Sequence, residues 1–456
     1  MTHSSVAAHL PAAWVAERRT DQQWLLCGLL AIFLLELALV LGLLPTFQRH
    51  FSALMDVGRV DNYNALAKNI IAGSGYRFTP TTALTLLREP GYPYFLAALS
   101  YVSDGSVRAA IIANLLLATV SALLLSRLAR HMSRDRWVPL IAPAVLLLHP
   151  GIVVAELRSG VEILFTLLLL CFFLLLRRAL QSERLAAYAA AGAMLGLACM
   201  VRSTPLLFPG FLLLYHIARK PGWDALRRSA AGVALMSGAA LLVLAPWGLR
   251  NYMLVHRFVV TASVQGVSEQ VGLYQCTQAD SGKNFGELDQ AAAATRNSLA
   301  AAQGYRFVPG YYQYFYSPTD ELKFNDFLGR QALATYRHAP ALLFKCGAEN
   351  LLNVWFRGRS ALVTLGICCV QLPFLLLAVL GLRTGWASTE RSTLICLLLF
   401  VGYSMAVCVP IHAEARYGIP LIPILALLGA CRIAAWLQQR RSSGAQTRLD
   451  MQPVGT

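Results

Sequence analysis

Long apolar runs recur along the chain, and this pattern limits what it can fold into more than any other feature. A helix needs about 20 mostly apolar residues to cross a bilayer, so most of these runs are long enough to span one, although 163–176 and 206–217 are marginal. Ala, Leu and Gly dominate without the alternation of barrel strands, and only 14% of residues are charged, against about a quarter in soluble proteins. We predict an all-α polytopic membrane protein with ten or eleven transmembrane helices. The runs are Trp24–Pro45, Ala109–Ser126, Trp137–Ala155, Ile163–Leu176, Ala186–Val201, Leu206–Ile217, Ala231–Gly248, Leu362–Leu382, Leu394–Ile411 and Tyr417–Ala435.

Basic residues mark every second short connection, which is the positive-inside pattern. It predicts cytoplasmic tails at 1–23 and 437–456 around a membrane domain at 24–436, with no cleavable signal peptide. The formal charge of +16 then reflects topology and attraction to anionic membrane lipids, and no nucleic-acid partner is expected. The arginines and lysine are Arg18, Arg19, Arg127, Arg130, Arg134, Arg136, Arg177, Arg178, Arg184, Arg219, Lys220, Arg227, Arg228, Arg383, Arg391, Arg440 and Arg441.

The same orientation leaves two large segments on the outer side, at 47–108 and 250–359, where short helices are expected. The remaining ionisable residues gather at this outer face. Within the first segment, Asp61, Tyr63 and Ala67 fit one face of a helix, and Pro90 and Pro93 discourage a continuous helix around Arg88 and Glu89. The apolar stretch 94–102 is too short to span and predicts a membrane-surface or re-entrant helix.

The order and placement of several short motifs resemble bacterial lipid-linked-sugar glycosyltransferases with the C-type (GT-C) fold. This group includes relatives of the protein O-mannosyltransferases and of the transferase that adds aminoarabinose to lipid A. The resemblance extends over most of residues 20–436, with large outer loops after the first and seventh spans. The motifs are Asp61-x-Tyr63, Gly73-x-Gly75-Tyr76, Arg88-Glu89-Pro90-Gly91-Tyr92-Pro93, Ala155-Glu156-x-x-Ser159, Met200-Val201-Arg202-Ser203-x-Pro205, Ala245-Pro246-Trp247-x-x-Arg250-Asn251-Tyr252 and Glu414-Ala-Arg416-Tyr417-x-x-Pro420-x-x-Pro423.

The resemblance implies an enzyme of the bacterial cytoplasmic membrane with an extracytoplasmic site. It implies a polyprenyl-phosphate sugar donor, an acceptor hydroxyl on a lipid, glycan or protein, and inversion at the anomeric carbon. The chemistry of the residues agrees with this. A sugar phosphate leaves as a stable anion, so one carboxylate base and cations for the phosphate suffice.

Asp61 is our candidate for the general base, with Asp56 as the second choice, although either acid alone would also fit a solvated loop or a helix cap. Arginine suits the phosphate because its planar fork meets two oxygens at once. The candidates in falling order are Arg250, Arg416, Arg202 and Arg88, some of which would instead snorkel to headgroups. Substrate contacts are assigned to Tyr63, Glu89, Tyr92, Glu156, Glu414 and Tyr417.

Other features carry weaker expectations. No metal-ligand motif is present, so no metal site or cofactor is predicted and a divalent-metal requirement is left open. The stretch 275–302 is expected to be mobile, and the tyrosines of 305–316 to lie in the headgroup belt or over bound substrate. Cys276 and Cys346 could form a disulfide if their side of the membrane is oxidising.

Two other functions remain open. A transporter or flippase for lipid-linked sugars would also need many spans, but it predicts internal repeats and ionisable residues near the membrane centre, where only Glu36 is found. A lipid-modifying transferase with another phosphate-linked donor would share most of the site.

Overall fold

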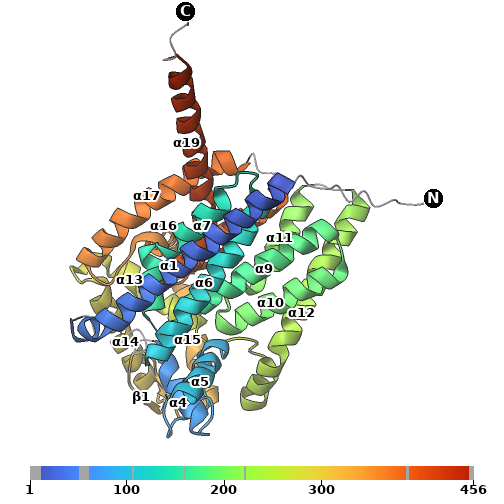
Figure 1. Ribbon diagram of the computed structural model, residues 1–456. Helices are drawn as coiled ribbons and strands as arrows, with labels where there is room; N and C mark the ends of the chain where they lie inside the picture. Colours follow the sequence, from blue (N-terminus) through green and yellow to red (C-terminus); the bar gives the residue numbers. More distant parts are fainter. Residues whose placement is uncertain are drawn as a thin grey trace, which may run out of the picture.

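The computed structural model describes residues 12–50, 61–104, 107–158, 160–219, 222–386 and 390–450. These residues are almost entirely helical, apart from one short antiparallel hairpin. The first residues of α1 and the projecting α19 lie at one end of the molecule, which we call the terminal end (Figure 1). Helices α4, α5 and α14 and strand β1 lie at the opposite end, which we call the loop end (Figure 1).

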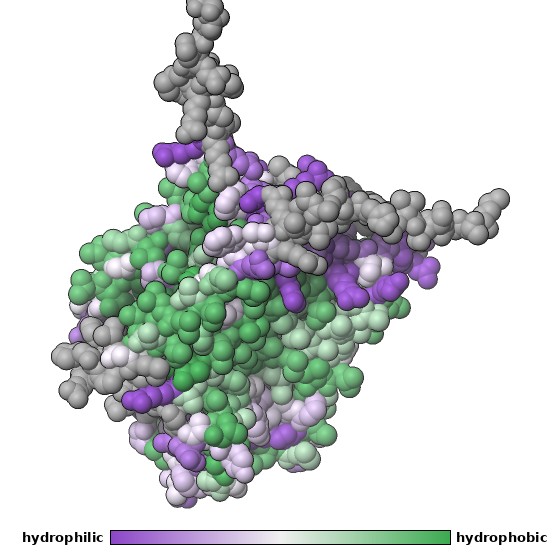
Figure 2. Space-filling view, in the orientation of Figure 1, coloured by the Kyte–Doolittle hydropathy of each residue, from purple (hydrophilic) through white to green (hydrophobic). Residues whose placement is uncertain are grey.

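The bundle between these ends is apolar. Among the described residues, seven helices are long and apolar enough to cross a membrane, and the bent pair of α7 and α8 adds an eighth. Figure 2 shows a broad hydrophobic band between hydrophilic residues at the two ends. The bundle consists of α1 (Ala12–His50), α6 (Val107–Met132), α7 (Val138–Leu147), α8 (Pro150–Glu156), α9 (Glu162–Ser182), α10 (Leu185–Val201), η1 (Thr204–Leu207), α11 (Phe208–Ala218), α12 (Trp223–Val255), α17 (Ala361–Trp386), α18 (Arg391–Cys408), η3 (Ala415–Leu421) and α19 (Ile422–Asp450).

Each of the ten predicted runs falls on one of these helices or helix pairs, which confirms the predicted all-α membrane fold. The runs 186–201 and 206–217 correspond to α10 and to η1–α11, which are apolar but shorter than a full span, whereas the marginal run 163–176 lies within α9, which is long enough to cross. The run 137–155 is broken into α7 and α8, which meet at 56°. The break falls at Pro150, because proline lacks the amide hydrogen that a continuous helix needs there.

The loop end is built from short helices and the hairpin. Strands β1 and β2 pair Phe307 with Phe315 and Val308 with Tyr314. The stretch 94–102, predicted to form a membrane-surface or re-entrant helix, lies in α5, which begins at Gly91. The elements are α4 (Tyr63–Ile71), α5 (Gly91–Ser103), α13 (Gln265–Thr277), η2 (Ala279–Ser281), α14 (Phe285–Ala302), β1 (Phe307–Val308), β2 (Tyr314–Phe315), α15 (Pro318–His338) and α16 (Pro340–Phe356).

The expectation of a mobile stretch at 275–302 is wrong for most of it, because α14 is an ordered helix. Its start is fixed by a capping box in which Asn284 and Glu287 bond each other's backbone amide. Its buried residues are Phe285, Leu288 and Arg296 together with the alanines Ala292, Ala293 and Ala300. The alanines pack closely but add little to an apolar sequence pattern, so the buried face was not evident from the sequence.

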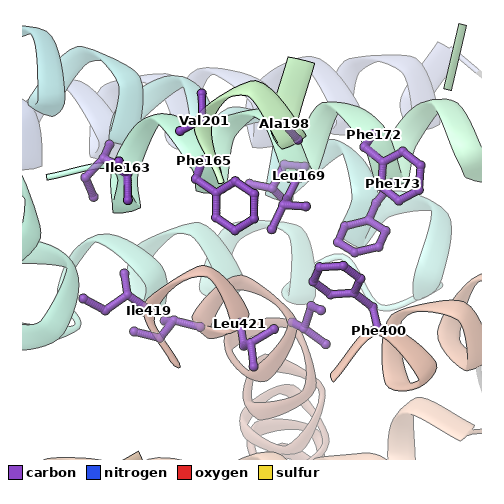
Figure 3. Packing of buried hydrophobic residues seen from close by; sticks show 14 of the residues in the cluster. Ile163, Phe165, Leu169, Phe172, Phe173, Ala198, Val201, Phe400, Ile419 and Leu421 are labelled. Carbon is purple, nitrogen blue, oxygen red and sulfur yellow. The ribbon is translucent and has the colours of Figure 1, made fainter. Parts of the chain in front are cut away.

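Apolar packing in the bundle holds η3, which carries Arg416, in place. The ring of Phe400 on α18 contacts Phe173 of α9 and Phe208 of α11 edge-on, with ring centroids 5.1 Å apart in both pairs. Ile419 and Leu421 of η3 lie opposite α9 in the same buried cluster (Figure 3). The η3 segment is therefore anchored in the apolar core just before it enters α19.

Helix α10 packs closely against α12. A Cβ atom at Gly192 would lie 2.1 Å from the carbonyl oxygen of Met236, so only glycine permits this approach. The end of α10 at Val201 is thereby fixed, and the next residue is Arg202. Close helix contact at a small residue is a usual way to associate helices in a membrane, where the hydrophobic effect between helices is weak.

Candidate active site

Asp61 lies immediately before α4 and is buried, with 4% of its surface exposed. The expectation that Asp61 shares a helical face with Tyr63 and Ala67 is wrong, because Asn62 between them adopts a left-handed backbone conformation with φ of 53°. Asparagine tolerates this conformation better than most residues. The turn at Asn62 separates the Asp61 carboxylate from the face of α4. Asp56, the second candidate base, lies outside the described residues.

Two arginines bind the Asp61 carboxylate, one on each oxygen. Nη2 of Arg88 donates to Oδ1 across 2.7 Å, and Nη1 of Arg416 donates to Oδ2. Nε of Arg416 also donates to Glu414 across 2.5 Å. We call these four residues the Asp61 cluster. Their side chains are 6–17% exposed, so the charges are largely removed from water.

Tyrosine rings cover Arg88 within this cluster. Its guanidinium carbon lies 4.5 Å from the ring centroid of Tyr312 and 5.4 Å from that of Tyr63. Arg88 also donates to the Tyr312 hydroxyl across 2.5 Å. Tyr312 comes from the connection between β1 and β2, and Asn62 donates to Tyr314 of the same hairpin. The hairpin therefore closes over the cluster. The sequence did not predict the contact between Tyr312 and Arg88, because a tyrosine of this loop could equally lie among lipid headgroups.

The charge of Asp61 is stabilised by its neighbours. Burial by itself raises the pKa of the Asp61 carboxyl, but Arg416 and Arg88, with a smaller effect from Arg202, outweigh it and hold this pKa well below its usual range. Asp61 is therefore ionised at neutral pH despite its burial.

Arg202 and Tyr417 form a second layer beside the cluster. The guanidinium carbon of Arg202 lies 4.2 Å from the ring centroid of Tyr417, and that of Arg416 lies 5.5 Å from it. The Tyr417 hydroxyl is 2.6 Å from Nε2 of His412. Burial lowers the pKa of His412 to about 4, so its imidazole is neutral at physiological pH. Arg202 is thus stacked on a ring whose hydroxyl is held by the half-buried His412.

Glu89 and Tyr92 fix the bend that presents Arg88. Oε1 of Glu89 accepts a hydrogen bond of 3.0 Å from the backbone amide of Ser203, which ties this loop to the end of α10. Tyr92 packs edge-on against Tyr63 with ring centroids 5.2 Å apart. Both side chains are buried, and they contact Ser203 and Tyr63, so they position the loop that carries Arg88.

Arg250 lies outside the Asp61 cluster. It donates to the carbonyl of Thr85 and to the Asn251 side chain, each across 2.8 Å. Its guanidinium carbon lies 4.5 Å from the Trp247 ring centroid, and its Nη2 is buried without a hydrogen-bond partner. Glu321 of α15 is nearby and accepts from Leu86 and Thr85 across 2.7 and 2.6 Å. These contacts hold the backbone just before Arg88.

Glu156 lies at the end of α8 and is fully buried, but neither carboxyl oxygen has a hydrogen-bond partner. The carboxyl oxygens of Glu36 on α1 likewise have no hydrogen-bond partner. Asn114 of α6 bonds the backbone of Glu156 rather than its side chain. Glu156 is thus not joined to the Asp61 cluster by a direct contact.

Tyr311 and Asp289 also lie near the cluster and were not predicted as site residues from the sequence. Tyr311 donates to Oδ1 of Asp289 on α14 across 2.7 Å. Burial raises the pKa of Asp289 to about 6, against the effect of the Tyr311 hydrogen bond. The only sequence signal was the concentration of aromatics at 305–316. Among the described residues, no group of three or more His, Cys, Asp or Glu side chains is arranged to hold a metal ion.

Comparison with known proteins gives a family match over part of the chain and a match in fold. Residues 88–249 match the family described as dolichyl-phosphate-mannose-protein mannosyltransferase, and this segment contains Arg88, Glu89, Glu156 and Arg202. Among proteins with curated functions, none has a matching sequence.

The fold matches the archaeal oligosaccharyltransferase AglB from Archaeoglobus fulgidus, solved with an inhibitory peptide and a dolichol-phosphate. The match has a TM-score of 0.52 at 11% identity and covers 94% of this chain. This chain spans about half the length of AglB, 52%. A second match is ArnT from Cupriavidus metallidurans bound to undecaprenyl phosphate, which covers 96% of this chain and 80% of that chain at 16% identity with a TM-score of 0.35.

The family match and the fold shared with AglB agree with the predicted resemblance. The candidate spans among the described residues support a multi-pass helical membrane protein.

Proposed function

We propose that this protein is an inverting glycosyltransferase that moves a sugar from a polyprenyl-phosphate carrier to an acceptor hydroxyl at the loop end. The observation that carries the proposal is the buried Asp61 carboxylate between Arg88 and Arg416 at one end of an apolar bundle. This reaction needs a general base for the acceptor proton and cations that stabilise the phosphate, and this arrangement could supply both. The dolichyl-phosphate-mannose of the family description and the dolichol-phosphate of AglB support a phosphorylated isoprenoid donor.

In this mechanism Asp61 accepts the proton of the acceptor hydroxyl as its oxygen attacks the anomeric carbon. The phosphate leaves from the opposite face, which gives inversion. Arg88 and Arg416 are proposed to bind the phosphate, with Arg202 as a third cation stacked on Tyr417. Arg250, ranked first from the sequence, stays a prediction as a phosphate ligand, because its present partners are Thr85 and Asn251. Tyr63, Glu89, Tyr92 and Glu414 would then act mainly by holding these groups.

The proposed orientation puts the loop end outside the cytoplasm, in the bacterial cytoplasmic membrane, with both tails inside. Basic connections at the terminal end support it through the positive-inside rule. A disulfide between Cys276 of α13 and Cys346 of α16 joins two helices of the loop end, as hypothesised from the sequence. Disulfides persist in oxidising compartments and are rare in the cytosol, so this bond supports the same orientation.

The test is sugar transfer from a panel of radiolabelled polyprenyl-phosphate sugars in membranes that contain the wild type or Asp61→Asn. We expect label to move from one donor in the wild type, and Asp61→Asn to lower the rate by roughly 10²–10⁴-fold, the usual contribution of a general base. Asp326→Asn is a matched control, because Asp326 pairs with Arg257 at the surface, away from the cluster. Full transfer by Asp61→Asn would exclude Asp61 as the base, and donor binding without transfer to any acceptor would favour the transporter.

A further inference from the structure

The two arginines that would bind the donor phosphate are already occupied by carboxylates of the protein itself. Arg88 donates to Asp61 and to Tyr312, and Arg416 donates to Asp61 and Glu414. Asp61 is 4% exposed and holds one nitrogen of each guanidinium group, so a phosphate that binds both arginines through paired contacts competes with its carboxylate. Arginine and phosphate make strong bidentate contacts, which makes such an exchange favourable once the phosphate has entered.

We propose, building on the proposed function, that the donor phosphate binds by taking Arg88 and Arg416 from Asp61, and that this exchange turns Asp61 into the base. Between its two arginines, Asp61 is a weak proton acceptor. When the arginines turn to the phosphate, the carboxylate keeps its burial but loses the cations that stabilise its charge. Its affinity for a proton then rises only when a donor is present. The enzyme would thus hold an inactive base until its donor arrives.

The proposed step is balanced in atoms and charge. The acceptor hydroxyl gives its proton to an oxygen of Asp61 while its oxygen forms a bond to the anomeric carbon. The bond from that carbon to the phosphate oxygen breaks, and its electron pair stays on the phosphate. The phosphodiester monoanion becomes a monoester dianion while Asp61 becomes neutral. One negative charge therefore moves from Asp61 to the phosphate, where Arg88 and Arg416 stabilise it.

The buried charges around the exchange are balanced before the donor enters. Three arginines, Arg88, Arg202 and Arg416, act on Asp61. Three further carboxylates, Glu89, Glu414 and Glu162, act on Arg88 and Arg416, and a fourth arginine, Arg158, faces Glu162 and Glu414. A phosphate adds a negative charge to four cations and four anions, so one carboxylate of this group is favoured to take a proton. Asp61 is the one whose two cations the phosphate removes.

The test measures binding of undecaprenyl phosphate to the purified full-length chain, with no sugar and no acceptor present. If the carboxylate competes with the phosphate for the arginines, Asp61→Asn should bind undecaprenyl phosphate at least tenfold more tightly than the wild type. Asp326→Asn, which also removes an aspartate from an arginine pair, should bind with wild-type affinity. Unchanged or weaker binding by Asp61→Asn overturns the exchange.

A second variant keeps the proposal testable if Asp61→Asn does not fold. Glu414→Gln removes the other carboxylate on Arg416, so it should tighten undecaprenyl phosphate binding several-fold; unchanged or weaker binding overturns the proposal. This binding measurement is independent of transfer. If the wild type transfers no sugar from any donor, the proposed function is wrong. If the wild type transfers sugar but Asp61→Asn binds undecaprenyl phosphate more weakly than the wild type, only the exchange is wrong.

Discussion

The Arg88 guanidinium and the Asp61 carboxylate lie 2.7 Å apart in a buried ion pair, although 27 residues separate them in the chain. The backbone that presents Arg88 is held from two sides. The hydroxyl of Tyr76 donates to the carbonyls of Arg88 and Glu89 across 3.1 and 3.0 Å, and Glu321 binds the residues just before them. The ion pair is therefore imposed by the surrounding loop, and it can be tested through that loop.

Removing one partner of this pair should destabilise the protein more than removing both. Arg88→Gln leaves the buried Asp61 with Arg416 alone, and breaking a buried pair in this way costs roughly 3–5 kcal/mol. Adding Asp61→Asn should recover part of this loss, with a coupling free energy of about 1–3 kcal/mol. The measurement is thermal unfolding of the two single variants and the double variant in detergent. Losses that simply add would show that the two side chains do not interact.

The hydroxyl of Tyr76 should matter although it touches neither Asp61 nor the charged end of Arg88. Tyr76→Phe leaves the carbonyls of Arg88 and Glu89 buried without this donor, at a cost of about 1–3 kcal/mol. Because the same carbonyls fix the bend, transfer activity should fall as well. Tyr316→Phe is the control, since Tyr316 is 47% exposed and should change neither property. Equal behaviour of the two variants would contradict the anchoring role of Tyr76.

The bundle was predictable because its signal is local, whereas the site is assembled from distant segments. Apolar runs mark each span, and counting spans brings Asp61 and Arg416 to the same end of the bundle. Their direct contact, across 355 residues, has no local signal. Tyr312 was equally hidden, because a tyrosine in a long loop has the same pattern whether it meets lipid, water or Arg88. Arg250 shows the converse, since a well-placed arginine at a span end turned out to bind the Thr85 carbonyl.

Glu321 should make stability depend on pH. Burial raises the pKa of Glu321 to about 7, against the hydrogen bonds from Thr85, Leu86 and Ser263, whereas an unfolded glutamate has a pKa of about 4.3. Between these values the folded state holds a proton that the unfolded state has lost. Stability should therefore fall as pH rises from about 4 to about 7, by roughly 3 kcal/mol in total.

The check is the melting temperature of the wild type and Glu321→Gln between pH 4.5 and 8. The wild type should lose stability more steeply with rising pH than Glu321→Gln, which has no proton to release. Asp280→Asn, at an exposed position, should follow the wild type. Parallel curves for the wild type and Glu321→Gln would show that Glu321 does not titrate in this range.

The disulfide between Cys276 and Cys346 should stabilise the loop end. It closes a loop of 70 residues, and loss of a native disulfide typically costs about 2–5 kcal/mol. Cys276→Ser and the double serine variant should therefore lower the melting temperature by similar amounts, because either removes the same bond. Non-reducing peptide mapping of protein from intact cells should recover the two cysteines in one linked species. Finding both thiols free would also remove the support for an outward-facing loop end.

At Gly91, one added methyl group should move the start of α5 away from the end of α10. A Cβ atom at Gly91 would lie 2.7 Å from the carbonyl oxygen of Met200 and 2.9 Å from the side chain of Val201. Gly91→Ala must therefore push the start of α5 away from the end of α10, which strains the bond between Glu89 and the Ser203 amide. We expect a loss of about 1–3 kcal/mol in stability together with lower transfer, because Arg88 moves with the bend.

Gly238 provides the matched control for this substitution. It lies within α12, and a Cβ atom there would meet nothing within 4 Å. Gly238→Ala should leave transfer unchanged and raise stability by up to about 1 kcal/mol, since alanine favours a helix over glycine. If Gly91→Ala behaved like Gly238→Ala in both unfolding and transfer assays, the close seating of α5 on α10 would not be what positions Arg88.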